Sequence, residues 1–178
     1  MSIEKNDAPE MDVFDAPETQ QEENRILTFR LEKQFYGISI THVEQILSMQ
    51  PLTGVPEFPA YAKGVMSLRG EVIPVVDLRM CIGLAEAPHT ERTCIVITNI
   101  GALHIGCIVD EVDTVVSVSE EELLPAPRMA ETSARENCTS GIAKLTGEDG
   151  RERAVICLDL SKLLRADEIS ALQKASEK

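Results

Sequence analysis

The side chains that most often perform catalysis are scattered along this chain. The three histidines lack the spacing of a metal site such as H-E-x-x-H; they are His42, His89 and His104. Ser67 does not stand in a G-x-S-x-G context, and no glycine-rich phosphate loop occurs. His104, Cys107 and Asp110 are close in sequence, but a separation of three places His104 and Cys107 on opposite faces of a regular strand. The sequence therefore predicts no enzyme, no metal site and no cofactor.

The five cysteines form no C-x-x-C pair, and most stand within runs of valine and isoleucine. They are Cys81, Cys94, Cys107, Cys138 and Cys157. Cysteine in such a run acts as a small buried apolar residue. We therefore expect buried thiols rather than a redox or metal site.

The best candidate for a functional side chain is Arg69, at the tip of a predicted hairpin over residues 64–76. Gly70 supplies the positive φ that a tight turn needs. Pro74 in the return strand cannot donate to a ladder, so we expect it at an edge or a bulge. A guanidinium at such a tip can present several donors to a carboxylate or to backbone carbonyls of a partner. The alternative is a solvated turn residue with no binding role.

Most of the remaining chain predicts short strands, over residues 26–31, 35–38, 93–98, 102–109, 112–118, 141–145 and 154–158. Apolar residues recur at spacings of three and four from Ile40 to Leu47, which predicts a brief helical turn followed by an edge segment over 48–53. Another helical turn is predicted over 58–64, with Gly64 at its exit.

Short helices are predicted after two aspartates, Asp77 and Asp159, which we interpret as N-caps. Ser119 and Glu122 match a capping box, so a short helix is predicted there that ends before Pro125. Residues 125–139 are predicted to form a loop. Asp167 is predicted to cap a terminal helix, with Ile169 and Leu172 facing inward.

The first hairpin has an echo later in the chain. The motif G-V-x-x-L-x-G-E at 64–71 is matched by G-I-x-x-L-x-G-E at 141–148, and each copy continues into an apolar strand, an Asp-Leu pair and a short helix. Short strands joined by helices too short for βαβ crossovers predict small barrels. At 178 residues the chain fits one domain, or two small units that share a core.

Residues 1–24 contain eight acidic residues and one basic residue, and they predict a disordered acidic tail. This tail contains Asp-Ala-Pro-Glu twice, which is either a docking motif or low-complexity drift. The net charge of −13 disfavours nucleic acid and acidic membrane surfaces as partners. No stretch reaches the roughly 20 apolar residues of a membrane span, and no signal peptide is evident, so we expect a cytoplasmic protein.

Four segments taken together resemble the signature of CheW-type chemotaxis coupling proteins. They are the hairpin over 63–79, the segments 35–38 and 106–112, and the second hairpin from residue 141. The resemblance covers residues 25–175 and implies a single domain of that type. The implied fold is mainly β, with two small five-stranded SH3-like β-barrels sharing a hydrophobic core, short helices and a C-terminal helix. The implied function is a non-enzymatic adaptor, recruited to membrane receptor arrays without direct membrane contact. It would couple the cytoplasmic tips of methyl-accepting chemotaxis receptors to the regulatory domain of the histidine kinase CheA.

The resemblance implies a receptor-binding role for Arg69, and it places Gly64 and Val43 in the same site. Around Arg69, Val43, Ile46 and Val65 are expected to form an apolar floor, which suits docking of a receptor helix in a groove.

Gln45 departs from the family pattern, because it stands where the family commonly has an acid, while Glu44 lies one residue earlier. A pairing of Arg69 with a carboxylate is therefore not implied, although Gln45 stays among the predicted receptor-binding residues. Two other functions stay open: a small-ligand-binding β module, and a coupling protein of a non-flagellar chemosensory pathway.

Overall fold

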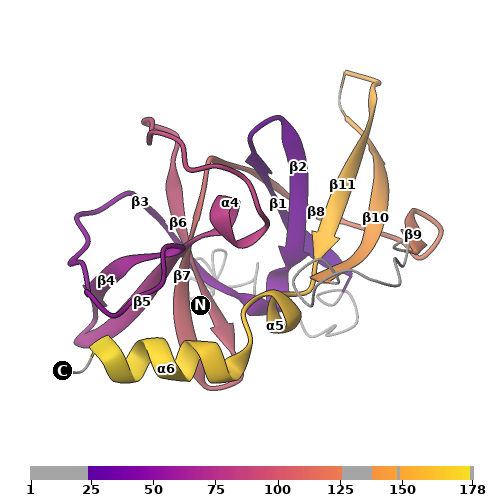
Figure 1. Ribbon diagram of the computed structural model, residues 1–178. Coiled ribbons are helices and arrows are strands. Elements are labelled where there is room, and N and C mark those ends of the chain that lie inside the picture. The colour runs from indigo at the N-terminus through magenta and orange to yellow at the C-terminus, as the bar shows by residue number, and fades with distance from the viewer. Residues whose placement is uncertain (1–23, 126–137, 148, 177–178) are drawn as a thin grey trace, which may run out of the picture.

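The computed structural model describes residues 24–125, 138–147 and 149–176, which form two β-sheets side by side (Figure 1). The predicted acidic tail over 1–24 lies outside these residues except for Asn24. The loop predicted over 125–139 also lies mostly outside them.

The six-stranded sheet has the order β8-β1-β2-β11-β10-β9. Its strands are β1 (Arg25–Leu31), β2 (Gln34–Ser39), β8 (Glu111–Ser117), β9 (Leu123–Pro125), β10 (Thr139–Thr146) and β11 (Glu152–Leu158). The five-stranded sheet has the order β3-β6-β7-β5-β4. Its strands are β3 (Val43–Ser48), β4 (Ala62–Leu68), β5 (Glu71–Asp77), β6 (Cys94–Ile100) and β7 (Leu103–Val109).

The prediction of a mainly β fold in two units is confirmed, with one correction in the number of strands. One sheet has six strands rather than five, because β9 pairs with β10. In the part of the chain that the structure describes, the ladders of named strands close neither sheet into a barrel. The five-stranded sheet comes nearest to closure, because Thr53, beyond the end of one edge strand, β3, forms a bridge with Val65 of the other edge strand, β4.

The two sheets have the same plan, and each is built from both halves of the chain. The hairpin β1–β2 corresponds to β6–β7, and the block from β3 to α4 (Leu78–Cys81) corresponds to the block from β8 to α5 (Leu160–Leu163). Each hairpin pairs with the distant block: β2 runs parallel to β11, and β7 runs parallel to β5. Even the register agrees, because Gly37 opposes Cys157 and Gly106 opposes Val75. The sequence echo is therefore a true internal repeat with exchanged partners.

A β-bulge, not a helix, explains the spacing of apolar residues after Ile40. Only Ile40–His42 is helical, as the 3₁₀ turn η1, and the chain then continues as strand β3. The register of β3 on β6 shifts between Val43 and Gln45, so Glu44 is the extra residue. Val43 and Ile46 therefore share one face of the sheet although they are three residues apart, whereas a regular strand would place them on opposite faces. The predicted helical turn was wrong beyond His42.

Residues 58–64 also differ from the predicted helical turn. One i to i+3 turn, 55–58, ends at Phe58, a second spans 59–62, and β4 begins at Ala62. One of the two hydrogen bonds of the predicted capping box forms: the Glu122 carboxylate accepts a hydrogen bond from the Ser119 backbone amide at 2.9 Å. No helix follows, because the next residues pair with β10 as β9.

Pro74 lies inside the five-stranded sheet rather than on its edge. Val65 hydrogen-bonds with Thr53 through both its backbone N–H and its C=O, so it makes no ladder hydrogen bond with Pro74, the residue opposite it on β5. In such a pair the backbone groups of both residues point away from each other, so the nitrogen of Pro74 points away from β4. The parallel ladder with β7 begins only at Val75. Pro74 therefore occupies a position at which a missing N–H interrupts no ladder hydrogen bond.

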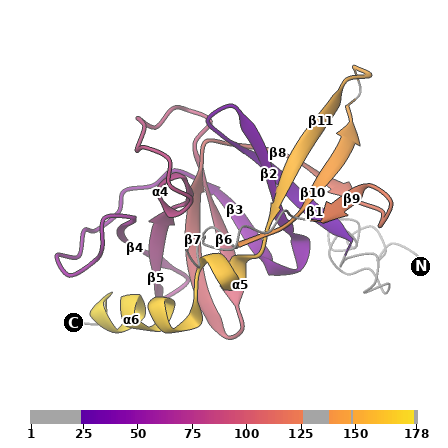
Figure 2. The same ribbon diagram turned by 45° about the vertical axis from the view of Figure 1, so that its right-hand side comes forward.

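The short helices after Asp77 and Asp159 and their caps were predicted correctly. Asp77 caps α4 and Asp159 caps α5, each by accepting the amide two residues ahead. The terminal helix α6 (Ala166–Ser176) begins one residue before Asp167 and packs on β5 and β7, below the five-stranded sheet in Figures 1 and 2. Ile169 and Leu172 are buried, as predicted.

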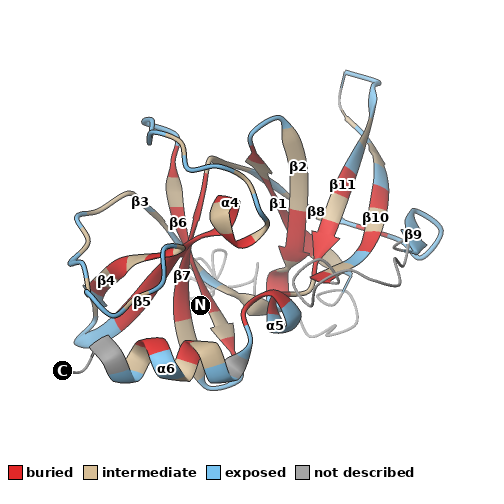
Figure 3. Ribbon diagram, in the orientation of Figure 1, coloured by how far each residue is buried: buried red, intermediate tan, exposed pale blue. Residues whose placement is uncertain are grey.

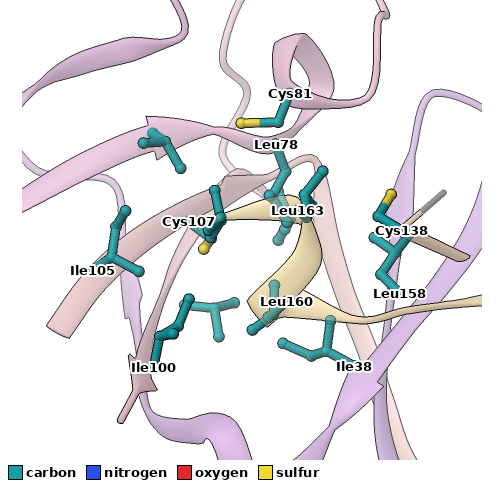
Figure 4. Close-up of a cluster of buried hydrophobic side chains, with 14 of the residues drawn as sticks. Ile38, Leu78, Cys81, Ile100, Ile105, Cys107, Cys138, Leu158, Leu160 and Leu163 are labelled. Atoms are coloured by element: carbon teal, nitrogen blue, oxygen red, sulfur yellow. The ribbon is translucent and has the colours of Figure 1, made fainter. Parts of the chain in front are cut away.

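The shared core is built from residues of both sheets, and buried residues recur along the strands of each (Figure 3). Leu160 and Leu163 of α5 lie among side chains from both sheets, including Ile38 and Cys107 (Figure 4). Four cysteines are buried and Cys94 is half-buried, and all five are free thiols, which agrees with the predicted apolar role.

Candidate functional site

Arg69 occupies an exposed two-residue turn between β4 and β5. Its φ is 55° and that of Gly70 is 83°, so both central residues adopt the left-handed conformation of a type I′ turn. Such turns prefer asparagine followed by glycine, and a non-glycine residue in this region is disfavoured. Within the described residues, the Arg69 side chain makes no hydrogen bond or ion pair. A strained, exposed and unpaired arginine is the pattern expected of a contact residue rather than a structural one.

Replacing Arg69 by asparagine is expected to raise the free energy of unfolding by about 0.5–1 kcal/mol, because asparagine adopts the left-handed region more readily. Urea denaturation measures this change. A loss of stability would show that the arginine side chain contributes contacts to the fold.

Gly64 and Val65 lie on β4, close to the segment that follows β3. Gly64 has a φ of 148°, and a Cβ at this position would lie 2.5 Å from the carbonyl oxygen of Thr53. Thr53 and Val65 exchange two backbone hydrogen bonds of 2.9 Å. Gly64 is therefore required by the close approach of two backbones rather than by a helix exit as predicted.

The predicted residues of β3 divide between the two faces of the strand. Ile46 is 42% exposed, and Val43, on the same face, packs against the shared core. Gln45 is half-buried on the opposite face, paired with Ile97. The bulge thus places Val43 and Ile46 together and turns Gln45 away from them.

Sequence reasoning missed a polar cluster that joins β3 to the base of the Arg69 turn. His104 of β7 lies between two carboxylates, with Nε2 3.1 Å from Glu44 and Nδ1 3.2 Å from Glu71. The Asn99 amide donates to the same Glu44 oxygen at 3.1 Å. Glu44 is the bulge residue of β3, and Glu71 follows Gly70, so the cluster lies between two predicted parts of the site. No sequence signal reveals it, because its members are far apart in the chain.

A second cluster surrounds Arg79 of α4, between the two sheets. Its guanidinium contacts Asp110, donates to Glu32 at 3.1 Å and donates to the Ala85 carbonyl at 3.0 Å. The Arg79 side chain is only 11% exposed. The cluster connects the β1–β2 turn, the β7–β8 junction and α4, so its role is to fix one half of the chain on the other.

Two open cavities bear on the alternative of a small-ligand module. One of about 430 Å³ is lined by Arg30, Arg79 and the loop around His89, and one of about 550 Å³ is lined by residues of the six-stranded sheet, among them Phe35 and Arg153. One cation in each cavity is already paired, Arg79 with Asp110 and Arg153 with Asp113. These two cations are therefore not free to anchor a small ligand.

The described residues contain no group of three or more His, Cys, Asp or Glu side chains placed to hold a metal ion. Burial raises the pKa of Cys107 to about 12, so this thiol is protonated at neutral pH. His104, Cys107 and Asp110 do not meet: Cys107 is in the shared core, and Asp110 binds Arg79. Within the same residues, no helix has the length and apolar character to cross a bilayer.

Comparison with known proteins identifies the family. The model of the CheW-like domain matches residues 25–168. Chemotaxis protein CheW of Klebsiella aerogenes is 33% identical over 151 residues, covering 85% of this chain and 87% of that protein. Chemotaxis protein CheW of Bacillus subtilis is 39% identical over 103 residues, covering 58% and 66%.

A solved structure agrees in fold. The crystal structure of scaffolding protein TtCheW from Thermoanaerobacter tengcongensis superposes with a TM-score of 0.70 at 28% identity. The match covers 82% of this chain and 95% of that one. This chain therefore belongs to the CheW-like family, whose members are scaffold proteins of chemotaxis signalling.

Proposed function

We propose that this chain is an adaptor without catalysis of its own, which joins the cytoplasmic tips of methyl-accepting chemotaxis receptors to the regulatory domain of the histidine kinase CheA. It would act in the cytoplasm, recruited to membrane receptor arrays. The observation that carries the proposal is Arg69, an exposed arginine kept in a strained turn without a partner in the described part of the chain. A receptor helix can supply carboxylate or carbonyl acceptors to such a guanidinium.

The receptor site in this proposal extends from the Arg69 turn over β4 and β5 and includes the edge strand β3. Ile46 and Val72 are large apolar side chains exposed near 42–43%, on β3 and β5. Val43, Gln45, Gly64 and Val65 stay in the proposed site, although Gly64 is buried and Gln45 lies on the other face of β3 from Val43 and Ile46. An arginine three residues before an exposed apolar side chain, Val72, suits a helix that docks with its apolar face and one polar contact.

We also propose that residues 25–175 act as one adaptor domain rather than two separable ones. Four of the strand ladders join the first half of the chain to the second: β1–β8, β2–β11, β3–β6 and β5–β7. Such pairing supports a rigid unit, which suits a protein that transmits signals between two partners.

Substituting Arg69 by asparagine is expected to weaken receptor-dependent control of CheA about tenfold, as loss of a hydrogen bond from a charged group would. The assay is kinase activity in membranes that contain receptor, CheA and the adaptor, titrated with wild type or variant. Arg92→Asn is the matched control, because Arg92 is 68% exposed and lies in a different loop. Equal titration curves for wild type and Arg69→Asn would remove Arg69 from the site, and no effect of the wild type on kinase activity would refute the adaptor function.

A further inference from the structure

The cluster around His104 bridges two strands that do not pair with each other. In the order β3-β6-β7-β5-β4, neither β5 nor β4 is a neighbour of β3. His104, on the central strand β7, reaches Glu44 of β3 with one ring nitrogen and Glu71 of β5 with the other. Glu44 adjoins Gln45 and Ile46, while Glu71 adjoins the Arg69–Gly70 turn. The imidazole thus links the two edges of the proposed receptor site.

The geometry defines the protonation state in which both links are made. A carboxylate oxygen only accepts hydrogen bonds, so each ring nitrogen must donate, and only the imidazolium has two donors. Burial by itself lowers the pKa of His104, but the hydrogen bond to Glu71 and the charges of Glu44 and Glu71 outweigh it, so the pKa is raised above its ordinary value. In the neutral ring, one nitrogen lone pair would face a carboxylate oxygen, and that link would break.

The groups that face His104 come from four elements. They are Glu44 on β3, Glu71 on β5, the neutral amide of Asn99 on β6, which donates to Glu44, and the neutral amide of Gln173 on α6, which lies 3.5 Å from the His104 carbonyl. The ionised groups in this set are the two glutamates. The charge balance of the cluster therefore changes when the imidazole titrates.

The second repeat provides an internal comparison. Three positions of the two repeats correspond. Phe35 corresponds to His104, because each stands two residues before the glycine of the parallel ladder, Gly37 or Gly106. Arg153 corresponds to Glu71, four residues before Cys157 or Val75, and Asp113 is the bulge residue of β8 as Glu44 is of β3. There Arg153 lies 3.8 Å from Asp113 and 4.6 Å from the centre of the Phe35 ring. The corresponding strands are thus joined by an arginine, which stays charged at all relevant pH values. Only the first repeat uses a titratable cation at this place.

We propose that His104 is a positioning residue that holds the β3 bulge and the Arg69 turn in the receptor-binding arrangement only when its ring is doubly protonated. Receptor binding then weakens as the pH rises through the His104 titration. The role in binding rests on the proposed receptor site, whereas the link between the two strands does not. The contribution of the cluster to the free energy of unfolding also decreases as the pH rises. It is fully present below about pH 6.5, the ordinary pKa of histidine, and is lost as the pH rises through the raised value.

The first experiment needs no partner. The ring nitrogens of His104 and the backbone amides of Gln45 and Gly70 are followed by NMR from pH 5.5 to 9 in the full chain. We expect the ring to titrate above about 6.5 and both amides to change at the same pH. His104→Gln should remove the change at both amides, and His42→Gln should leave it, which excludes the other nearby imidazole as its source. A ring that titrates at or below 6.5, or amides that do not follow it, would overturn the proposal.

The second experiment measures the affinity of a soluble receptor-tip fragment over the same pH range. We expect about fivefold weaker binding by the wild type above the His104 pKa than below it, and binding by His104→Gln that is weak at every pH. The double substitution Glu71→Arg with His104→Phe installs the arrangement of the second repeat, and it should bind with no pH dependence. Affinity of the wild type that stays constant while the amides titrate would overturn the positioning role. Absence of receptor binding at every pH would instead refute the proposed function, and the NMR titration would still decide whether His104 links the strands.

Discussion

Replacing Arg79 by alanine is expected to lower the free energy of unfolding by about 2–4 kcal/mol, the largest effect of any single charged residue discussed above. The substitution removes three contacts at once and leaves Asp110 half-buried without its cation. Glu32 is 54% exposed, so solvent compensates part of the loss on that side. The change is measured by urea denaturation at neutral pH.

Two further variants separate the causes of the Arg79 effect. Arg79→Met keeps most of the aliphatic stem, so the difference between the methionine and alanine variants reports packing rather than charge. Arg92→Ala removes an exposed arginine and should change stability by less than about 0.5 kcal/mol. An Arg79→Ala variant within about 1 kcal/mol of the wild type would mean that the cluster does not hold the two halves together.

Replacing Gly64 by alanine is expected to lower the free energy of unfolding by about 2–4 kcal/mol. The new methyl group would lie 2.5 Å from the Thr53 carbonyl oxygen, in a backbone conformation that only glycine adopts readily. The strand must then separate from Thr53, which breaks the Thr53–Val65 bridge. Urea denaturation gives the stability change, and amide exchange at Thr53 and Val65 reports the loss of the bridge.

Gly54→Ala is the matched control for this prediction. Gly54 is next to Thr53, a Cβ added there would meet no atom within 4 Å, and its backbone does not need a positive φ. Its substitution should change stability by no more than about 0.5 kcal/mol. If both alanine variants have equal stability, the close approach at Gly64 is not what limits substitution there.

Features governed by neighbouring residues could be predicted from the sequence. Asp77 and Asp159 cap their helices because the cap interaction involves residues two apart, and both hairpins form because their turns carry glycine at the required place. The sequence predicts that Arg69 lies in the turn but not that its φ is positive. The first central position of such a turn prefers asparagine, so an arginine there does not indicate a left-handed conformation.

Features that depend on distant pairing could not be predicted. The spacing of Val43 and Ile46 fits both a helix and a bulged strand, and pairing with β6 decides between them. Ser119 and Glu122 satisfy a local capping pattern, yet pairing with β10 overrides it. The links of His104 to Glu44 and Glu71 span 60 and 33 residues, beyond the range of any local pattern.

The exchange of partners between the two repeats has a consequence for synthesis on the ribosome. When the chain has emerged as far as α4, β3 lacks its neighbour β6, and β2 and β5 each lack the partner on one side, because β11 and β7 are still to be made. These unpaired edges carry apolar strands that can associate with other chains. The six-stranded sheet is incomplete until β11 has been translated, so the edge of β2 stays unpaired until nearly the whole domain has been made.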